Sequence, residues 1–154
     1  MAFACIHIPN FLVQAVVRGE PALRGRALAL VDGVPPLCRV VAASETAIRA
    51  GIELDMAKAQ AEQFGNSVEM RRRSPEQERN AHAALLDLGG SFSPRVEDTA
   101  PETILLDLAG LDALFGGAEN LARRLAQGVL DVCGLVAHIA VAPNPDVALH
   151  AARA

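Results

Sequence analysis

Short apolar blocks alternate with polar residues along the chain, and Pro or Gly separates most of the blocks. Apolar runs of roughly four to eight residues that end at turn signals predict β-strands. With two weaker segments, at 68–70 and 95–99, the expected strands cover residues 3–8, 27–32, 37–42, 103–108 and 135–142. The turn-forming residues at 32–36 and at 100–101 predict that the segments on either side pair as hairpins.

The clearest helix start lies at Ser74. Pro75 occupies the first helical position and Gln77 completes the pattern of a capping box. We expect this helix to end near Leu88, because the next two residues, 89 and 90, are glycines. Other helices are expected to begin after the capping residues Asn10, Ser44, Asp55 and Asn144.

Residues 118–132 have the spacing of an amphipathic helix, and a short helical piece is expected just before them at 111–115. The apolar residues in the longer segment recur at intervals of three or four positions and therefore share one face. That predicted face consists of Leu121, Leu125, Val129 and Val132.

The order of elements predicts the fold class. With residues 10–70 left aside, the order is strand, helix, strand, strand, helix, strand, which is that of a ferredoxin-like βαββαβ unit. We therefore expect an α+β fold in which residues 1–9 and 71–154 form this unit. Residues 10–70 would be a small subdomain inserted after the first strand.

The composition narrows the class of protein. The chain has 154 residues, 51% of them hydrophobic, which suits one domain or a domain with a small inserted lobe. Apolar runs end well before the length that spans a bilayer, and no basic segment precedes the first one. We expect a cytoplasmic protein that contacts no membrane. Cys5, Cys38 and Cys133 lack metal-site spacing and are expected to be reduced core thiols.

The charge distribution argues against tight DNA binding by the chain alone. The net charge is −4, and residues 80–154 carry four basic against nine acidic side chains. A protein that grips duplex DNA unaided usually presents a basic face to the phosphates. We therefore expect contact with DNA to be weak or indirect.

Two segments resemble the catalytic motifs of Y-family (translesion) DNA polymerases. One is residues 3–17, FACIHIPNFLVQAVV, and the other is residues 93–107, SPRVEDTAPETILLD. The resemblance covers essentially the whole chain, and it implies that the ferredoxin-like unit is the palm and the insertion is the fingers. The family's thumb and little finger have no counterpart before residue 154, so we expect the chain to be a fragment.

The resemblance also implies that the catalytic acids are replaced. His7 stands where the family has a metal-binding Asp, and Glu102 and Thr103 stand where it has Asp-Glu. Two-metal nucleotidyl transfer needs carboxylates that hold a pair of Mg²⁺ ions, and one carboxylate is too few. We therefore expect no catalytic residue, no metal and no cofactor.

The nucleotide-binding positions are degenerate as well. The family's sugar-selecting aromatic matches Leu12, and its triphosphate-binding Tyr and Arg match Glu45 and Ile48. Arg49 lies about 100° further round a helix than Ile48, which makes it a weak substitute. The lysines that the family places near the last helix match Pro145 and Leu149.

Within the family, the chain is most similar to the non-catalytic ImuB branch. The segments that carry this likeness are residues 37–43, 71–75, 92–101 and 142–153. The likeness implies a scaffold in SOS-induced mutagenesis, in the bacterial cytoplasm and at the nucleoid during repair. Its implied partners are the sliding clamp, an ImuA-type accessory protein and an error-prone replicative-type polymerase.

Two other functions stay open at this point. An active, divergent polymerase could recruit Glu97 or Asp98 to metal, and the chain could instead be a plain DNA-binding module. The three arginines at 71–73 are a possible contact for phosphate or for an acidic partner, and a solvated loop is an equal alternative. Asp107 is expected to form a structural hydrogen bond.

Overall fold

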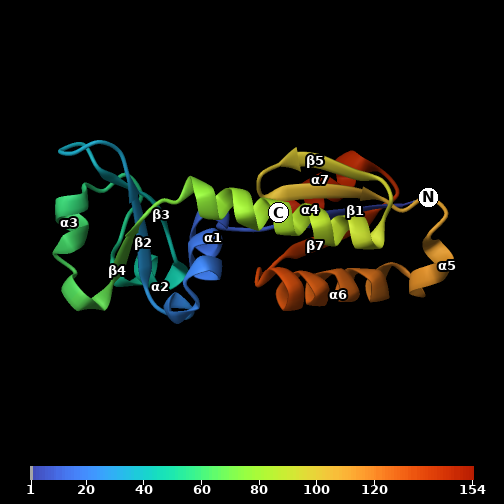
Figure 1. The fold of residues 1–154 in the computed structure, drawn as a ribbon, viewed down its shortest axis with the longest axis horizontal. Coiled ribbons are helices and arrows are strands. Elements are labelled where there is room, and N and C mark those ends of the chain that lie inside the picture. The colour runs from blue at the N-terminus through green and yellow to red at the C-terminus, as the bar shows by residue number, and fades with distance from the viewer. Residues whose placement is uncertain (1) are drawn as a thin grey trace. The chain divides into compact units, whose positions relative to one another are not determined.

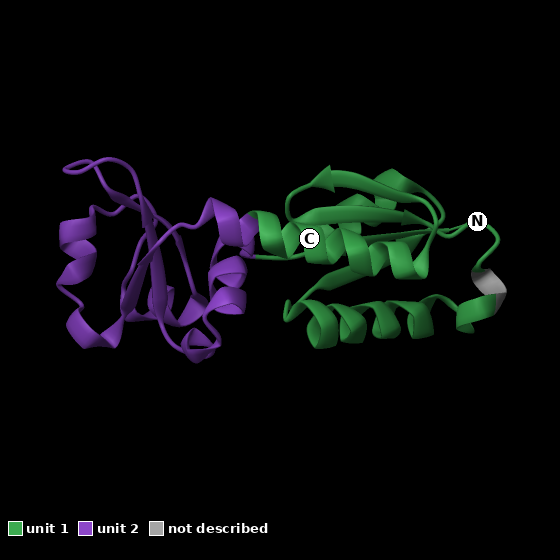
Figure 2. Cartoon of the chain, in the orientation of Figure 1, with its two compact units in different colours: residues 1–9, 79–154 green, residues 10–78 purple. Residues whose placement is uncertain are grey.

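The computed structural model describes residues 2–154, apart from the side chains of residues 112 and 113 (Figure 1). The chain divides into two compact units, residues 1–9 with 79–154 and residues 10–78 (Figure 2). The second boundary lies at 78/79 rather than at the predicted 70/71. The reason is that residues 69–72 form a strand that pairs within the inserted unit.

The first unit contains a four-stranded antiparallel sheet in the order β5-β6-β1-β7. Its strands are β1 (Phe3–His7), β5 (Val96–Ala100), β6 (Thr103–Asp107) and β7 (His138–Ala142). The helices α4 (Pro75–Phe92) and α6 (Ala118–Gly128) connect them in the order β1, α4, β5, β6, α6, β7. This is the predicted ferredoxin-like unit, so the α+β fold class is confirmed.

Helix α4 continues through both glycines at which we expected it to stop. Gly89 is buried against the sheet, and a Cβ built on it would lie 2.8 Å from Ile104 Cδ1 and 3.1 Å from Leu106 Cδ2. The missing side chain therefore allows a close approach of helix to sheet and does not end the helix. The predicted start is confirmed, because the Gln77 amide donates to Ser74 Oγ at 3.2 Å.

The apolar face of α6 changes register near its end. Leu121, Leu125 and Val129 are buried as predicted, but Val132 is 69% exposed and Cys133 is buried in its place. The cause is a π-helical turn, η3 (Val129–Cys133), that continues from α6. A wider turn inserts an extra residue and shifts which side chain faces the core. The short helix α5 (Asp112–Phe115) precedes α6.

Helix α7 (Pro145–Arg153) covers the other face of this sheet. Its start is capped as predicted, since Asn144 Oδ1 accepts from the Asp146 amide at 2.8 Å. Alternate residues of a strand point to opposite faces, so the face opposite Ile104 and Leu106 carries Cys5 and Leu105. The apolar cluster under α7 consists of Cys5, Leu105, Ala142, Ala148 and Ala152.

The inserted unit contains a three-stranded sheet in the order β3-β2-β4. Its strands are β2 (Leu28–Asp32), β3 (Arg39–Ala43) and β4 (Glu69–Arg72); β2 and β3 form the predicted hairpin, while β4 runs parallel to β2. Helix α1 (Phe11–Gly19) and the short η1 (Pro21–Leu23) share one core with the sheet. Helices α2 (Glu45–Ala50) and α3 (Lys58–Glu62) share another, and η2 (Gly65–Ser67) leads into β4.

Two of the predicted caps in this unit are wrong. Asn10 has a left-handed backbone with φ 49°, and its side chain donates to the Ala43 carbonyl at 2.8 Å and does not cap α1. Asp55 is also left-handed, with φ 70°, and α3 begins only at Lys58. Ser44 is a true cap, because its Oγ accepts from the Ala47 amide at 3.3 Å.

All three cysteines are buried and form no disulfide, as the sequence predicted. In the part of the chain that the structure describes, no helix is both long enough and apolar enough to cross a bilayer.

Candidate functional site

The three residues that the family likeness predicts in place of catalytic acids come together at one end of the β1–β6 pair. His7 is the direct cross-strand partner of Thr103, and Glu102 precedes Thr103 in the β5–β6 turn. His7 Nδ1 and Thr103 Oγ1 are 2.9 Å apart, and the Thr103 side chain is fully buried. The Glu102 carbonyl accepts from the Ile8 amide at 2.8 Å, which fixes the turn to the end of β1.

The hydrogen bonds of this group have one consistent direction. Thr103 Oγ1 donates to Glu102 Oε1 at 3.3 Å, because an ionised carboxylate can only accept. The single hydroxyl proton of Thr103 is thereby committed, so its oxygen accepts from His7 Nδ1–H. The chain His7 to Thr103 to Glu102 selects the Nδ1–H tautomer of His7.

The surroundings of His7 favour its neutral form. Burial lowers the pKa of His7, the nearby charges of Arg153 and His138 lower it further, and Glu102 raises it in opposition. Two residues earlier on the same face of β1, burial raises the pKa of the Cys5 thiol to about 11. At neutral pH the His7 ring and the Cys5 thiol are therefore both uncharged. Of the group formed by His7, Glu102 and Thr103, the acidic side chain is Glu102.

This donor set does not fit a pair of magnesium ions. Mg²⁺ requires oxygen ligands in near-octahedral geometry, and two ions need several carboxylates between them. Here one carboxylate accepts from a buried hydroxyl that is itself bonded to an imidazole. Among the described residues, no three His, Cys, Asp or Glu side chains are grouped so that they could hold a metal.

The acids that could substitute are held elsewhere. Asp98 accepts from His82 Nε2 at 2.9 Å, and His82 lies on α4, across the sheet from His7. Glu97 lies on the same face as Leu105, its cross-strand partner, in a shallow hollow shared with Asp107. Asp107 has the expected structural role, since its Oδ1 accepts from the Ala109 amide at 2.9 Å.

The degenerate nucleotide-binding positions lie in the inserted unit. Glu45 and Ile48 are on α2, where Ile48 is half exposed, and Arg49 lines the same shallow depression beside them. Arg49 is therefore nearer to these two residues than its angle on the helix suggested. Leu12 is partly buried against the core shared by α1 and β2.

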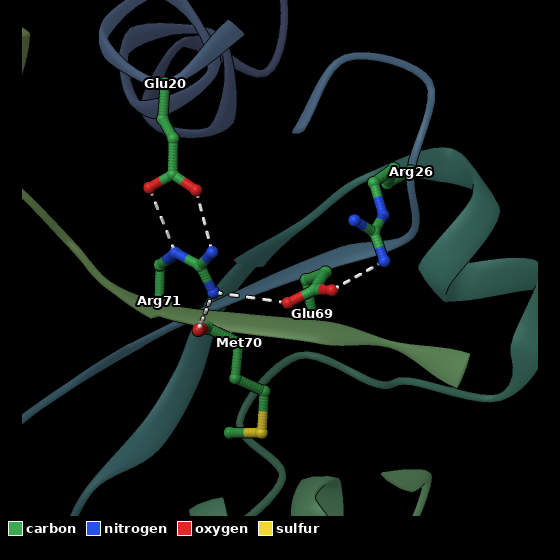
Figure 3. A network of polar contacts seen from close by, with 5 residues as sticks. All are labelled: Glu20, Arg26, Glu69, Met70 and Arg71. Atoms are coloured by element: carbon green, nitrogen blue, oxygen red, sulfur yellow. Dashed lines mark hydrogen bonds and ion pairs between the residues drawn. The ribbon is translucent and has the colours of Figure 1, made fainter. Parts of the chain in front are cut away.

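The three consecutive arginines do not form a solvated loop, because Arg71 and Arg72 lie on β4. Arg71 holds Glu20 through two bonds, Nε to Oε1 at 3.2 Å and Nη2 to Oε2 at 2.7 Å (Figure 3). Its Nη1 donates to the Met70 carbonyl at 2.8 Å and to Glu69, which also pairs with Arg26 at 2.7 Å.

The other two arginines also have carboxylate partners within the inserted unit. Arg73 holds Glu78 in a bidentate pair at 2.9 and 3.0 Å. Arg72 lies 3.6 Å from Asp32 and donates to the Gly33 carbonyl at 2.9 Å, while its side chain is 60% exposed. Of the three, Arg72 has the greatest freedom to contact phosphate.

Sequence reasoning missed His138, the partner of His7 on the other side of β1. His7 and His138 are directly opposed in the β1–β7 register, and their ring centroids are 6.4 Å apart. The two residues are 131 positions apart in sequence. Only the strand order places them together, so no local signal could have identified the pair.

Comparisons with known proteins agree with this fold. A family model described as the impB/mucB/samB family matches residues 6–153. Curated proteins give no significant match. DinB from Sulfolobus solfataricus superimposes with a TM-score of 0.79 at 20% identity, over 97% of this chain and 44% of that one.

Two further solved structures have similar scores. An insertion ternary complex of Dbh DNA polymerase aligns with a TM-score of 0.80 at 20% identity, over 97% of this chain and 44% of that one. A Y-family DNA polymerase chimera aligns with a TM-score of 0.76 at 20% identity, over 94% and 43%. The chain thus spans less than half the length of these proteins. Because the family model covers nearly every residue, the chain belongs to the impB/mucB/samB family of Y-family polymerase relatives.

Proposed function

We propose that this chain is the palm and fingers of a catalytically inactive Y-family homologue that acts as a scaffold in translesion synthesis. The observation that carries the proposal is the His7–Thr103 hydrogen bond. It occupies the place where polymerases of the family present carboxylates to metal. A half-buried imidazole bonded to a buried hydroxyl is a satisfied pair of neutral groups that is stable without any ion, whereas clustered carboxylates repel one another until a cation arrives.

The inserted unit supports the same proposal. Glu45 begins α2 and is exposed beside Ile48, at the positions where the family binds the incoming triphosphate. A carboxylate there repels a triphosphate, and Ile48 offers it no hydrogen bond. Among the described residues, the depression is lined by one cation, Arg49, and Glu45 on the same face offsets its charge.

We further propose that the protein belongs to the ImuB branch and works through protein contacts. Its partners would be the sliding clamp, an ImuA-type accessory protein and an error-prone replicative-type polymerase, met in the bacterial cytoplasm during the SOS response. Contact with DNA would be weak or indirect. Two observations support weak binding of DNA phosphates rather than tight binding. Residues 80–154 have an excess of acidic side chains, and Arg71 and Arg73 are already paired with carboxylates.

The alternative function is an active, divergent translesion polymerase. The solved polymerase structures resemble this chain in fold, but at 20% identity the likeness does not extend to activity. It would require Glu97 or Asp98 to reach the group formed by His7, Glu102 and Thr103. The contact of 2.9 Å between Asp98 and His82, on the other face of the sheet from His7, weighs against that for Asp98, because a metal would have to displace it.

Primer extension by the full-length protein distinguishes the two functions. We expect no extension above background with Mg²⁺ or Mn²⁺, and no loss of damage-induced mutagenesis in cells on Glu102→Ala. Glu97→Ala and Asp98→Ala serve as matched variants for the rival acids. Extension that disappears on Glu102→Ala, or on either matched variant, would establish the enzyme and refute the scaffold.

A further inference from the structure

His7 and His138 form a cross-strand histidine pair on one face of the sheet. They are directly opposed on the antiparallel strands β1 and β7, and their rings are tilted by 48° with centroids 6.4 Å apart. Opposed residues on neighbouring strands have Cβ atoms about 4.5–5.5 Å apart, so both imidazoles reach the same volume of space. His138 begins β7 and is exposed, so solvent reaches its ring.

The His7 ring is prepared to act as a ligand. Its Nδ1–H donates to Thr103 Oγ1 at 2.9 Å, and Thr103 donates onward to Glu102. The Nε2 atom of this tautomer therefore carries a free lone pair. Histidines that bind metals commonly donate their other ring N–H to an outer partner in this manner, which fixes the ring and raises its basicity.

From this geometry we infer that His7 and His138 together bind a borderline transition-metal dication, such as Zn²⁺ or Ni²⁺, through one ring nitrogen each. Two bonds of about 2.0–2.1 Å at the tetrahedral angle need nitrogens roughly 3.3 Å apart, which rotation of His138 can supply. Water would fill the other positions, since no third protein ligand is grouped with the pair among the described residues.

The chemistry of the pair selects the ion. Imidazole suits Zn²⁺, Ni²⁺ and Cu²⁺, whereas Mg²⁺ and Mn²⁺ prefer oxygen ligands. The sequence led us to expect no metal, because the carboxylates that bind Mg²⁺ are missing. That argument applies to Mg²⁺ and Mn²⁺, and it does not apply to ions that prefer imidazole. Nearby charges act in opposite directions: Glu102 attracts a cation and Arg153 repels it.

A bound ion would tie an outer strand to the middle of the sheet. In the order β5-β6-β1-β7, strand β7 lies at the edge and pairs with β1 as its strand neighbour. An ion that bridges His7 and His138 adds a cross-link between these strands in the folded state only, so it should raise the unfolding temperature with concentration. This inference is independent of the proposed function, because a scaffold and an enzyme would bind the ion equally.

The test is a titration of the chain with NiCl₂, ZnCl₂ and MgCl₂. Ni²⁺ should broaden amide signals around residues 7 and 138 first, and Zn²⁺ should raise the melting temperature while Mg²⁺ does neither. His138→Gln should weaken Ni²⁺ binding by at least about tenfold. Loss of a residue that only hydrogen-bonds a metal ligand already costs that much, and His138 is proposed as a ligand itself. His150→Gln is the matched control, an exposed histidine on α7, and should leave binding unchanged.

A second measurement does not depend on metal. Long-range ¹H–¹⁵N spectra of the metal-free protein should show His7 as the Nδ1–H tautomer, and Thr103→Val should shift it toward a mixture. The inference is overturned if Ni²⁺ broadening centres on His82 or His150, or is absent. Binding that survives His138→Gln, or a His7 ring protonated at Nε2 alone, overturns it equally.

Discussion

Gly89 of α4 approaches Ile104 of β6 so closely that a side chain at position 89 would meet it. A Cβ there would lie 2.8 Å from Ile104 Cδ1, a fully buried atom group, whereas a Cβ on Gly90 would meet nothing within 4 Å. Adjacent glycines in one helix thus have opposite roles. One allows close packing, and the other only lowers helix propensity.

We therefore expect Gly89→Ala and Gly90→Ala to change stability in opposite directions. Gly90→Ala should stabilise the protein by about 0.5–1 kcal/mol, the usual gain in helix propensity. Gly89→Ala should be less stable than Gly90→Ala by roughly 1–3 kcal/mol, the cost of an overpacked core. Urea denaturation of the two variants measures the difference. Equal stabilisation by both would mean that α4 can move off the sheet without cost.

The pair between Glu20 and Arg71 should make stability depend on acid pH. Hydrogen bonds from Arg71 lower the pKa of Glu20 below its ordinary value of 4.5. A carboxyl with a lowered folded-state pKa stabilises the fold above its unfolded pKa, and that contribution is lost as pH falls through the folded value. Glu20→Gln should lower the melting temperature at pH 7, and this difference should shrink below pH 4.5 and vanish once the pH is below the lowered pKa of the folded state.

Glu53→Gln is the matched control for that prediction. It removes another carboxylate of the inserted unit, whereas the carboxylates paired with Arg71 are those of Glu20 and Glu69. It should shift the melting temperature little at any pH. A Glu20→Gln deficit that persists unchanged at pH 3 would assign the effect to packing rather than to charge.

Restoring the acids of the family should destabilise the metal-free protein. Thr103 is fully buried, so the variant His7→Asp, Glu102→Asp, Thr103→Glu brings like charges together in a buried place. We expect a loss of about 3 kcal/mol or more at pH 7. Such carboxyls have raised pKa values, so stability should recover as the pH falls and they bind protons. Primer extension should still be absent, because Glu45 and Ile48 are unchanged.

A neutral triple variant separates charge from shape in that experiment. His7→Asn, Glu102→Asn and Thr103→Gln have the same sizes as the restored acids but no charge. This variant should show no recovery of stability at acid pH. Identical pH profiles for the two triple variants would rule out repulsion as the reason that the acids are absent.

Ser93 should be important to stability in spite of its small size. Its side chain is 2% exposed, donates to the Asp107 carbonyl at 2.6 Å and accepts from the Arg95 amide at 3.1 Å. Ser93→Ala removes both of these bonds, at a cost of about 1–3 kcal/mol. Ser91→Ala, two residues earlier, removes a single bond to the Leu88 carbonyl from an exposed residue and should cost less, about 0.5 kcal/mol. Chemical denaturation of both variants tests the difference.

Local chemistry explains what the sequence could predict about the fold. The caps at Ser44, Ser74 and Asn144 are confirmed, because each side chain bonds an amide two or three residues away. Asn10 failed because a contact with Ala43, 33 residues distant, outweighs local capping. The helix stop at Gly89 failed for the same reason, since packing against Ile104 decides the role of that glycine.

In the candidate site too, local sequence signals predicted part of the arrangement, and contacts between residues far apart in the sequence decided the rest. The grouping of His7, Glu102 and Thr103 followed from motif likeness and strand order, and the structure places all three together. The strand position of the arginine run could not be interpreted from sequence, because two of its partners, Glu20 and Asp32, are tens of residues away. His138 was missed since it meets His7 only through the pairing of the first and last strands.

The two compact units each contain a buried thiol, Cys5 in one and Cys38 in the other, whose rate of alkylation reports how often that unit opens. The thiolate is the form that reacts with alkylating agents, and a pKa of about 11 with complete burial silences Cys5 while the four-stranded sheet is closed. Cys38 lies just before β3 and is 5% exposed, and its Sγ–H donates a hydrogen bond to the Gly33 carbonyl at 3.2 Å. The alkylation rates of these two residues therefore time the opening of palm and fingers separately, in the native chain and without an added label.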